Sequence, residues 1–195
     1  MKQLEFQLFS GDVMQIPCDT LIMPLPADER PLRGEAGLVD WRVCGAISEH
    51  LASGYVTAKK GEVVLLPAPR PLAASRLLLV GLGPGKRLQG KGLQRALSLA
   101  CDRILSLRAG LGLVALPGAV DFALDASPIV RGCCASLARL RGDGRLQVAF
   151  ASGLERARTL EAALAGLGTI PPDKGINVSV EWPEAEVQPV GASAT

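Results

Sequence analysis

The sequence is poor in aromatic residues and in long apolar runs, and each shortage excludes a class of protein. Aromatic residues make up 4% of the 195 residues, so few rings are available to stack on bases. No run of about 18 apolar residues occurs, so no membrane-spanning helix is expected. The stretch Met1–Phe6 has no apolar signal core, which predicts a cytoplasmic protein.

Histidine is almost absent, and the cysteines are odd in number. His50 is the single histidine, and no C-x-x-C pair occurs. A tetrahedral metal site needs a denser set of ligands than this, so no metal is predicted. No catalytic residue and no cofactor are predicted either. The five cysteines are expected to be buried, reduced and apolar; they are Cys18, Cys44, Cys101, Cys133 and Cys134.

Net charge is small, at +2, and the arginines are scattered. The densest group is Arg139, Arg141 and Arg145 around a predicted turn. A nucleic-acid binder usually carries a concentrated basic face. A solvated surface is therefore favoured over DNA binding.

Apolar periodicity predicts an α/β domain. The segment 4–9 alternates like an edge strand, 76–82 is apolar enough for a central strand, and 27–37 is predicted to be a loop. Helices interleaved with apolar strands indicate a three-layer fold, with a mixed, mostly parallel sheet and helices on both faces. Further strands are predicted at 19–25, 62–66, 111–116 and 146–151, and helices at 40–53, 92–107, 127–140 and 154–167.

We expect a single domain over 1–195, with its core at about 3–167. Residues 170–195 form an extension with a candidate edge strand at 178–182 and a flexible end. Ligands of such sheets bind outside the carboxyl ends of the strands.

Local motifs resemble those of a known family. Gly11-Asp12-Val13, followed after four residues by Cys18-Asp19-Thr20-Leu21-Ile22, resembles the opening of macrodomains. Gly45-Ala46-Ile47-Ser48, Gly61-Glu62 and Val80-Gly81-Leu82-Gly83 are similar, in order and spacing, to the N-terminal domain of leucyl aminopeptidases, itself macro-like. The resemblance covers about residues 3–167 and implies a macrodomain-like fold.

Departures from the macrodomain pattern bear on function. Macrodomains that process ADP-ribose end the second strand in Asn-Ala-Ala-Asn, where this chain has Met23-Pro24-Leu25-Pro26. Their second phosphate loop is rich in glycine, where this chain keeps Gly118 and places Asp121 nearby. ADP-ribosyl hydrolysis by that route is therefore not expected, and a carboxylate would repel a diphosphate.

The resemblance still implies a set of candidate ligand-binding residues. Asp12 stands where true macrodomains contact adenine, and the loop of Arg33, Gly34 and Gly37 joins it, together with Gly118. The alternative is structural, because an acid after glycine is a common turn residue and glycines permit tight bends.

Other candidate chemistry is weaker. Gly81–Lys86 lacks the Gly-Lys-Ser/Thr ending of a phosphate loop, so a structural turn is favoured over anion binding. Ser48 and His50 sit two apart on a predicted helix, where side chains do not face each other.

Leucyl aminopeptidases hold two metal ions in a separate C-terminal domain, whose Asn-Thr-Asp-Ala-Glu-Gly-Arg motif does not occur in this sequence. The expectation is a non-catalytic module that acts through a protein partner or as a homo-oligomer. The alternative is binding of ADP-ribose or a related nucleotide.

Overall fold

The structure is a computed structural model that describes residues 2–10, 12–84, 91–108, 110–115, 127–139, 144–152, 158, 161–162 and 176–181. Within these ranges the helices are α1 (Gly34–Arg42), α2 (Ala46–Ala52), α3 (Lys91–Ser106) and α4 (Ser127–Arg139). The strands are β1 (Lys2–Ser10), β2 (Cys18–Pro26), β3 (Val63–Pro67), β4 (Ala74–Gly83), β5 (Leu111–Val114), β6 (Gly144–Ser152) and β7 (Ile176–Glu181).

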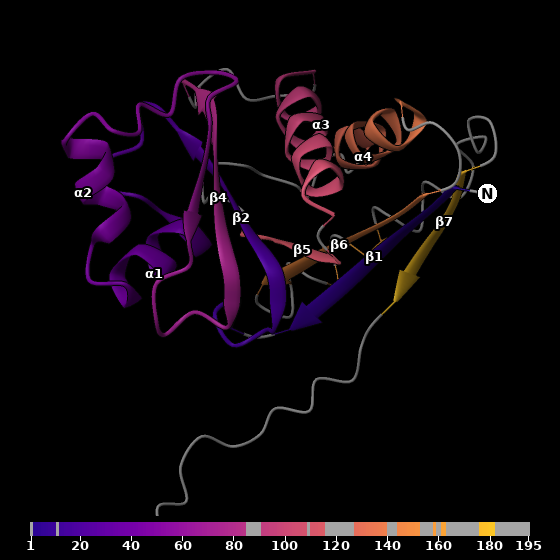
Figure 1. The fold of residues 1–195 in the computed structure, drawn as a ribbon, viewed down its shortest axis with the longest axis horizontal. Coiled ribbons are helices and arrows are strands. Elements are labelled where there is room, and N and C mark those ends of the chain that lie inside the picture. The colour runs from indigo at the N-terminus through magenta and orange to yellow at the C-terminus, as the bar shows by residue number, and fades with distance from the viewer. Residues whose placement is uncertain are drawn as a thin grey trace, which may run out of the picture.

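The strands form one sheet in the order β3-β4-β2-β5-β6-β1-β7 (Figure 1). The pairing of β3 with β4 is antiparallel, and each other pairing along the order is parallel. The predicted mixed, mostly parallel sheet is confirmed. The strong twist of the sheet turns β1 well away from the direction of β4 (Figure 1).

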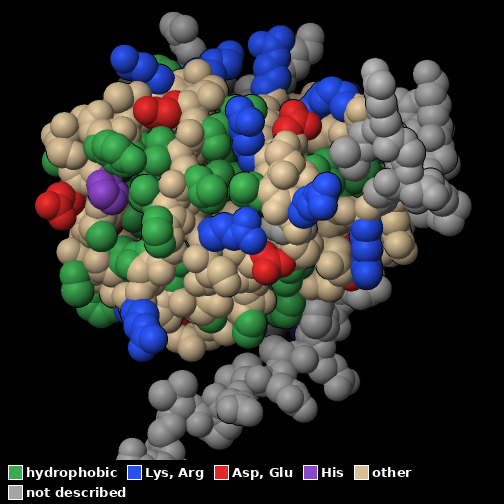
Figure 2. All heavy atoms as spheres, in the orientation of Figure 1, with side chains coloured by type: hydrophobic (Ala, Val, Ile, Leu, Met, Phe, Trp, Pro, Cys, Tyr) green, Lys and Arg blue, Asp and Glu red, His purple; other side chains and the backbone are tan. Residues whose placement is uncertain are grey.

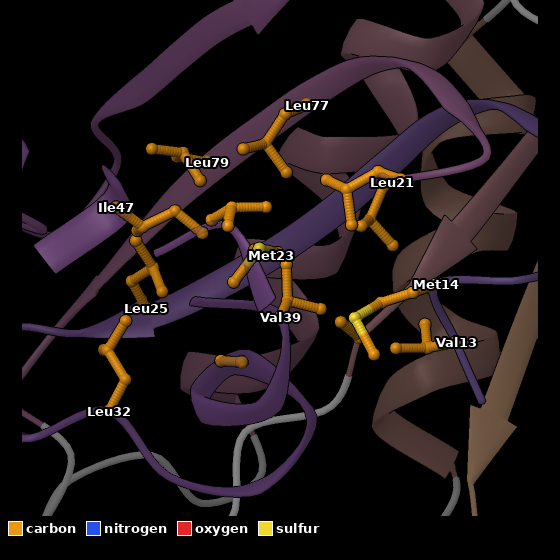
Figure 3. Close-up of a cluster of buried hydrophobic side chains, with 14 of the residues drawn as sticks. Val13, Met14, Leu21, Met23, Leu25, Leu32, Val39, Ile47, Leu77 and Leu79 are labelled. Atoms are coloured by element: carbon orange, nitrogen blue, oxygen red, sulfur yellow. The ribbon is translucent and has the colours of Figure 1, made fainter. Parts of the chain in front are cut away.

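Two apolar cores form because successive side chains of a strand point to opposite faces. On β2, Ile22 packs into the core on the α3 and α4 side. Leu21 and Met23 pack into the other core with Val39 of α1 and Ile47 of α2 (Figure 3). The sheet is thus covered by helices on both faces, which is the predicted three-layer arrangement.

The prediction that β1 is an edge strand is wrong. β1 pairs with β6 on one side and β7 on the other, and β7 occupies the edge, as predicted for the extension. The alternation in β1 reflects one polar face and not an open edge. Leu4 and Phe6 are fully buried in a core, and Glu5 is also buried, on the opposite face, at 4% exposure.

The predicted single helix over 40–53 is also wrong. It is two short helices separated at Val43–Gly45, and the first begins inside the predicted loop, at Gly34. Cys44 and Gly45 adopt positive φ values of 56° and 79°, which no α-helix contains. Cys44 is therefore exposed outside a helix, contrary to prediction.

Pro24 does not end β2, whose last residue is Pro26. Pro24 is tolerated within the strand because of the direction in which its nitrogen faces. Ala115 N–H donates to the Ile22 carbonyl across the β2–β5 pair, so the nitrogen of Pro24, two residues on, faces the same side. The last residue pair of β2 with β5 is Ile22 with Val114, and no ladder bond is lost there.

Several predictions fall outside the described residues. These are almost all of the helix over 154–167, the loop from Gly118 to Phe122 and the end of the extension. Within the described part of the chain, no helix is long and apolar enough to cross a bilayer.

Candidate functional site

Asp12 lies in a tight turn after β1. Its Oδ1 accepts a hydrogen bond from the Met14 N–H at 3.0 Å, and the Gln15 N–H donates to the Asp12 carbonyl at 3.0 Å. The next two residues, Val13 and Met14, are buried in the core shared with α1 (Figure 3). This geometry gives Asp12 a turn role, and its exposed carboxylate remains at the surface.

The second candidate segment precedes and opens α1. Arg33 is exposed, and its N–H is bound by Glu29 Oε1 at 3.1 Å. Gly34 opens the helix at a φ of 62°. A Cβ on Gly37 would lie 2.5 Å from the Leu32 carbonyl oxygen, so glycine is needed there for close packing of α1 against the preceding loop.

The predicted site residues are held by separate local contacts. The Met14 carbonyl accepts from the Ala73 N–H, immediately before β4 begins. The segment leading to Arg33 follows β2 in the chain and begins beside the other end of β4, where the Ala27 N–H donates to the Gly83 carbonyl. These segments are thus anchored at opposite ends of β4, and Gly118 lies outside the described residues.

Asp40 was missed by sequence reasoning, although it organises the segment that resembles the aminopeptidase motif. Its side chain is buried at 8% exposure. Oδ1 accepts from the Ile47 N–H at 2.9 Å and from the Ser48 N–H at 3.0 Å. The Ser48 hydroxyl donates to Oδ2. An acid on α1 thereby caps α2, and the available signal was an acid shortly before a Gly-Ala-Ile-Ser helix start.

Glu62 performs a similar task at the start of β3. Its carboxylate accepts from the Thr57 N–H at 3.0 Å and from the Thr57 hydroxyl at 3.0 Å. Gly61, at a φ of 85°, donates to the Gly81 carbonyl, and the Gly81 N–H donates to the Glu62 carbonyl. Together these contacts form a glycine bulge, which explains the Gly-Glu pair.

The segment 58–60 crosses closely over the end of β4, where Gly81 and Gly83 carry no side chains that would block it. The Gly83 N–H donates to the Ala58 carbonyl at 3.0 Å. A Cβ on Gly81 would collide with the Lys59 carbonyl oxygen. These contacts give Gly81 and Gly83 a packing role at the end of β4, whereas Gly85 and Lys86 lie outside the described residues.

Ser48 and His50 contact neighbouring side chains, and two of the cysteines are buried. Ser48 binds Asp40, while the His50 ring lies 5.3 Å from the Tyr55 ring. Cys101 and Cys133 are buried, as predicted, with their sulfurs 3.3 Å apart. The Cys101 contact and burial raise the pKa of Cys133. Among the described residues, no cluster of three or more His, Cys, Asp or Glu could hold a metal ion.

Large apolar side chains are exposed on α1 and just after α2. Leu38 is 59% exposed and Trp41 74% exposed on α1, and Tyr55 follows α2 at 62%; we call these three residues the α1–α2 surface. The Arg42 guanidinium stacks 5.6 Å from the Trp41 ring centre. Figure 2 shows hydrophobic side chains gathered around His50, in the half of the molecule that contains α1 and α2.

The fold defines the class of protein first. A macrodomain of Oceanobacillus iheyensis superposes with a TM-score of 0.61 at 13% identity, covering 83% of this chain and 90% of that one. The macro domain of ganglioside induced differentiation associated protein 2 gives 0.58 at 15% identity, with 80% and 81% covered. Tomato leucine aminopeptidase gives 0.53 at 21% identity, with 82% of this chain and 35% of that chain covered. The domain has a macrodomain-like fold.

The family follows from the sequence comparisons. The family model described as Cytosol aminopeptidase family, N-terminal domain, matches residues 22–139, so the chain belongs to that family. A probable cytosol aminopeptidase of Pseudomonas syringae is 36% identical over 85 residues, or 44% of this chain and 16% of the relative. One of Stutzerimonas stutzeri is 32% identical over 107 residues, or 55% and 21%. The matched segments thus span about a fifth or less of these relatives.

Proposed function

We propose that this domain is a non-catalytic macro-like module that acts by binding proteins, including copies of itself, in the cytoplasm. The observation that carries the proposal is the exposure of Trp41, at 74%, three residues after Leu38, at 59%, on the same helix α1. Large apolar side chains grouped at a surface are typical of protein interfaces. Trp and Arg are also the residue types that most often dominate binding energy, and here Arg42 stacks on Trp41.

The α1–α2 surface is held rigid by the fold. The buried carboxylate of Asp40 fixes the start of α2 relative to α1. Val39 and Ile47 anchor the undersides of the two helices in the core. A preorganised surface loses less conformational entropy on binding than a mobile one, which supports a docking role.

The test is partner binding by matched variants. The purified chain, Trp41→Ser and Arg103→Ser are immobilised separately; Arg103 is exposed on α3, away from the α1–α2 surface. A protein held by the parent and by Arg103→Ser, but not by Trp41→Ser, is then purified and titrated against all three. Equal affinity of that partner for the parent and Trp41→Ser would refute the docking role.

A second candidate function is nucleotide binding in the macrodomain cleft. It is favoured by one observation, the exposed carboxylate of Asp12 fixed by the Met14 N–H. The residues proposed to bind are Asp12, Arg33, Gly34, Gly37 and Gly118. Calorimetric titration with ADP-ribose, ADP and AMP tests it. Saturable binding that is lost in Asp12→Ala supports a working cleft, and flat traces at millimolar ligand end the proposal.

A further inference from the structure

Among the strands that the structure describes, β3 lies at one end of the sheet and pairs with β4 alone. Within this part of the chain its other edge is open to a partner, and the strand is uncharged. From Val63 to Pro69 the sequence carries no charged residue, and Leu65 is 44% exposed. Natural sheets usually protect such an edge with charged side chains, because unpaired N–H and C=O groups invite another strand.

The hydrogen bonds to β4 identify the groups that face outward. The Gly81 N–H donates to the Glu62 carbonyl, and the Ala68 N–H donates to the Ser75 carbonyl. Backbone groups alternate sides at each residue of a strand. The even-numbered residues of β3 therefore face β4, and the outward-facing residues are Val63, Leu65 and Pro67.

These three residues are complementary to a second copy of themselves. In an antiparallel pair centred on Leu65, the two Leu65 residues exchange both of their N–H to C=O hydrogen bonds. The Val63 N–H of each copy then donates to the Pro67 carbonyl of the other. Pro67 has no N–H to leave unpaired, and the two exposed Leu65 side chains meet on the same face of the joined sheet.

We infer that two copies of this chain associate through β3, antiparallel and centred on Leu65, to form one continuous sheet. The inference rests on the proposed interaction role and names one partner, a second copy. It uses an edge distinct from the α1–α2 surface, so the two proposals can fail separately. The five residues of β3 and the two that follow carry no charge, so two copies do not repel each other at this edge, which favours this occupant.

The first test is sedimentation velocity over a range of concentrations. The parent is expected to shift from monomer to twice the monomer mass. Leu65→Pro removes two of the four cross-copy hydrogen bonds without touching the bonds to β4, and should weaken dimerisation by at least about tenfold. Trp41→Ser should dimerise like the parent. A parent that stays monomeric, or a Leu65→Pro dimer of unchanged affinity, overturns the inference.

The second test reads the register. In an antiparallel hydrogen-bonded pair the facing Cα atoms lie about 5.5 Å apart, within the range of a disulfide. In a Cys44→Ser background, Leu65→Cys should form a covalent dimer on mild oxidation. Pro67→Cys should not, because its copies would lie four residues out of register, about 14 Å along the strand. Equal cross-linking of both variants, or none of Leu65→Cys, overturns the inference.

If Trp41→Ser loses the external partner while the parent remains monomeric, the interaction role stands and the β3 pairing is wrong. If Leu65→Cys cross-links while no partner depends on Trp41, the β3 pairing stands and the docking role of the α1–α2 surface is wrong.

Discussion

The Ser48 hydroxyl on α2 donates a 2.5 Å hydrogen bond to the Asp40 carboxylate on α1, and this pair holds the first two helices together. The same carboxylate accepts two backbone N–H groups at the start of α2. Such N–H groups have no partner within their own helix, so Asp40 supplies what the helix lacks. The shape of the α1–α2 surface therefore depends on a buried acid and not on apolar packing alone.

Replacement of Asp40 is expected to destabilise the domain. Asp40→Ala leaves buried N–H groups without an acceptor and should lower the free energy of unfolding by about 2–3 kcal/mol. Asp40→Asn keeps one acceptor oxygen and should lose about 1 kcal/mol. Urea unfolding measures both. Glu49→Ala, an exposed acid on α2, is the control, and an Asp40→Ala variant as stable as this control would contradict the capping role.

Glu5 should make stability depend on pH in the acid range. Burial on the sheet raises its pKa, but hydrogen bonds from Arg145, Gln7 and Gln147 outweigh burial, and the pKa lies below its ordinary value of 4.5. A folded-state pKa below the unfolded one means that the group stabilises the fold above the unfolded pKa. This stabilisation is lost as pH falls through the folded pKa.

Unfolding free energies between pH 7 and pH 3 test this for the parent and Glu5→Gln. The parent should lose more stability than Glu5→Gln as pH falls below about 4.5. The quantity to compare is the change of the unfolding free energy with pH, and not its value at pH 7. A neutral isostere at a buried ionic site can be as stable as the parent at pH 7. Parallel curves for the two proteins would show that Glu5 has no depressed pKa.

Apolar periodicity located most elements because burial decides both the pattern and the structure. The break between α1 and α2 could not be found this way, since the stripe of Trp41, Val43, Ile47 and Leu51 continues through it. The break depends on a carboxylate contact between residues eight apart. The place of β1 in the sheet was equally hidden, because its polar face is matched by Arg145 and Gln147, about 140 residues away.

The arrangement of the candidate site residues was harder to predict from the sequence than the fold. A motif gives the order of Asp12 and Arg33 along the chain but not their separation in space. Their placement depends on backbone contacts at the two ends of β4, from Ala73 to Met14 and from Ala27 to Gly83, which no local motif reveals. The turn role of Asp12 was foreseeable as an alternative, because an acid beside glycine commonly binds a backbone N–H two residues on.

Gly81 should tolerate no side chain. Its Cβ would collide with the Lys59 carbonyl oxygen and press on Ala58, and backbone atoms cannot move aside cheaply. Gly81→Ala should lower the free energy of unfolding by at least about 2 kcal/mol. Gly54 offers a comparison, because its Cβ would enter open space at a φ of 76°, and Gly54→Ala should lose about 1 kcal/mol. If Gly81→Ala and Gly54→Ala lose similar amounts of stability in thermal or urea unfolding, the close approach of Ala58 and Lys59 to Gly81 is contradicted.

Cys44 should be the most reactive thiol of the chain. It is exposed in the break between α1 and α2. Cys18 is partly buried, and burial raises its pKa to about 11, so only about one molecule in a thousand carries its thiolate at pH 8. The thiolate is the reactive species. Titration with a disulfide reagent at pH 8 should show a fast phase that Cys44→Ser removes and Cys18→Ser leaves intact. A fast phase that survives in Cys44→Ser would mean that another sulfur is more accessible than this fold allows.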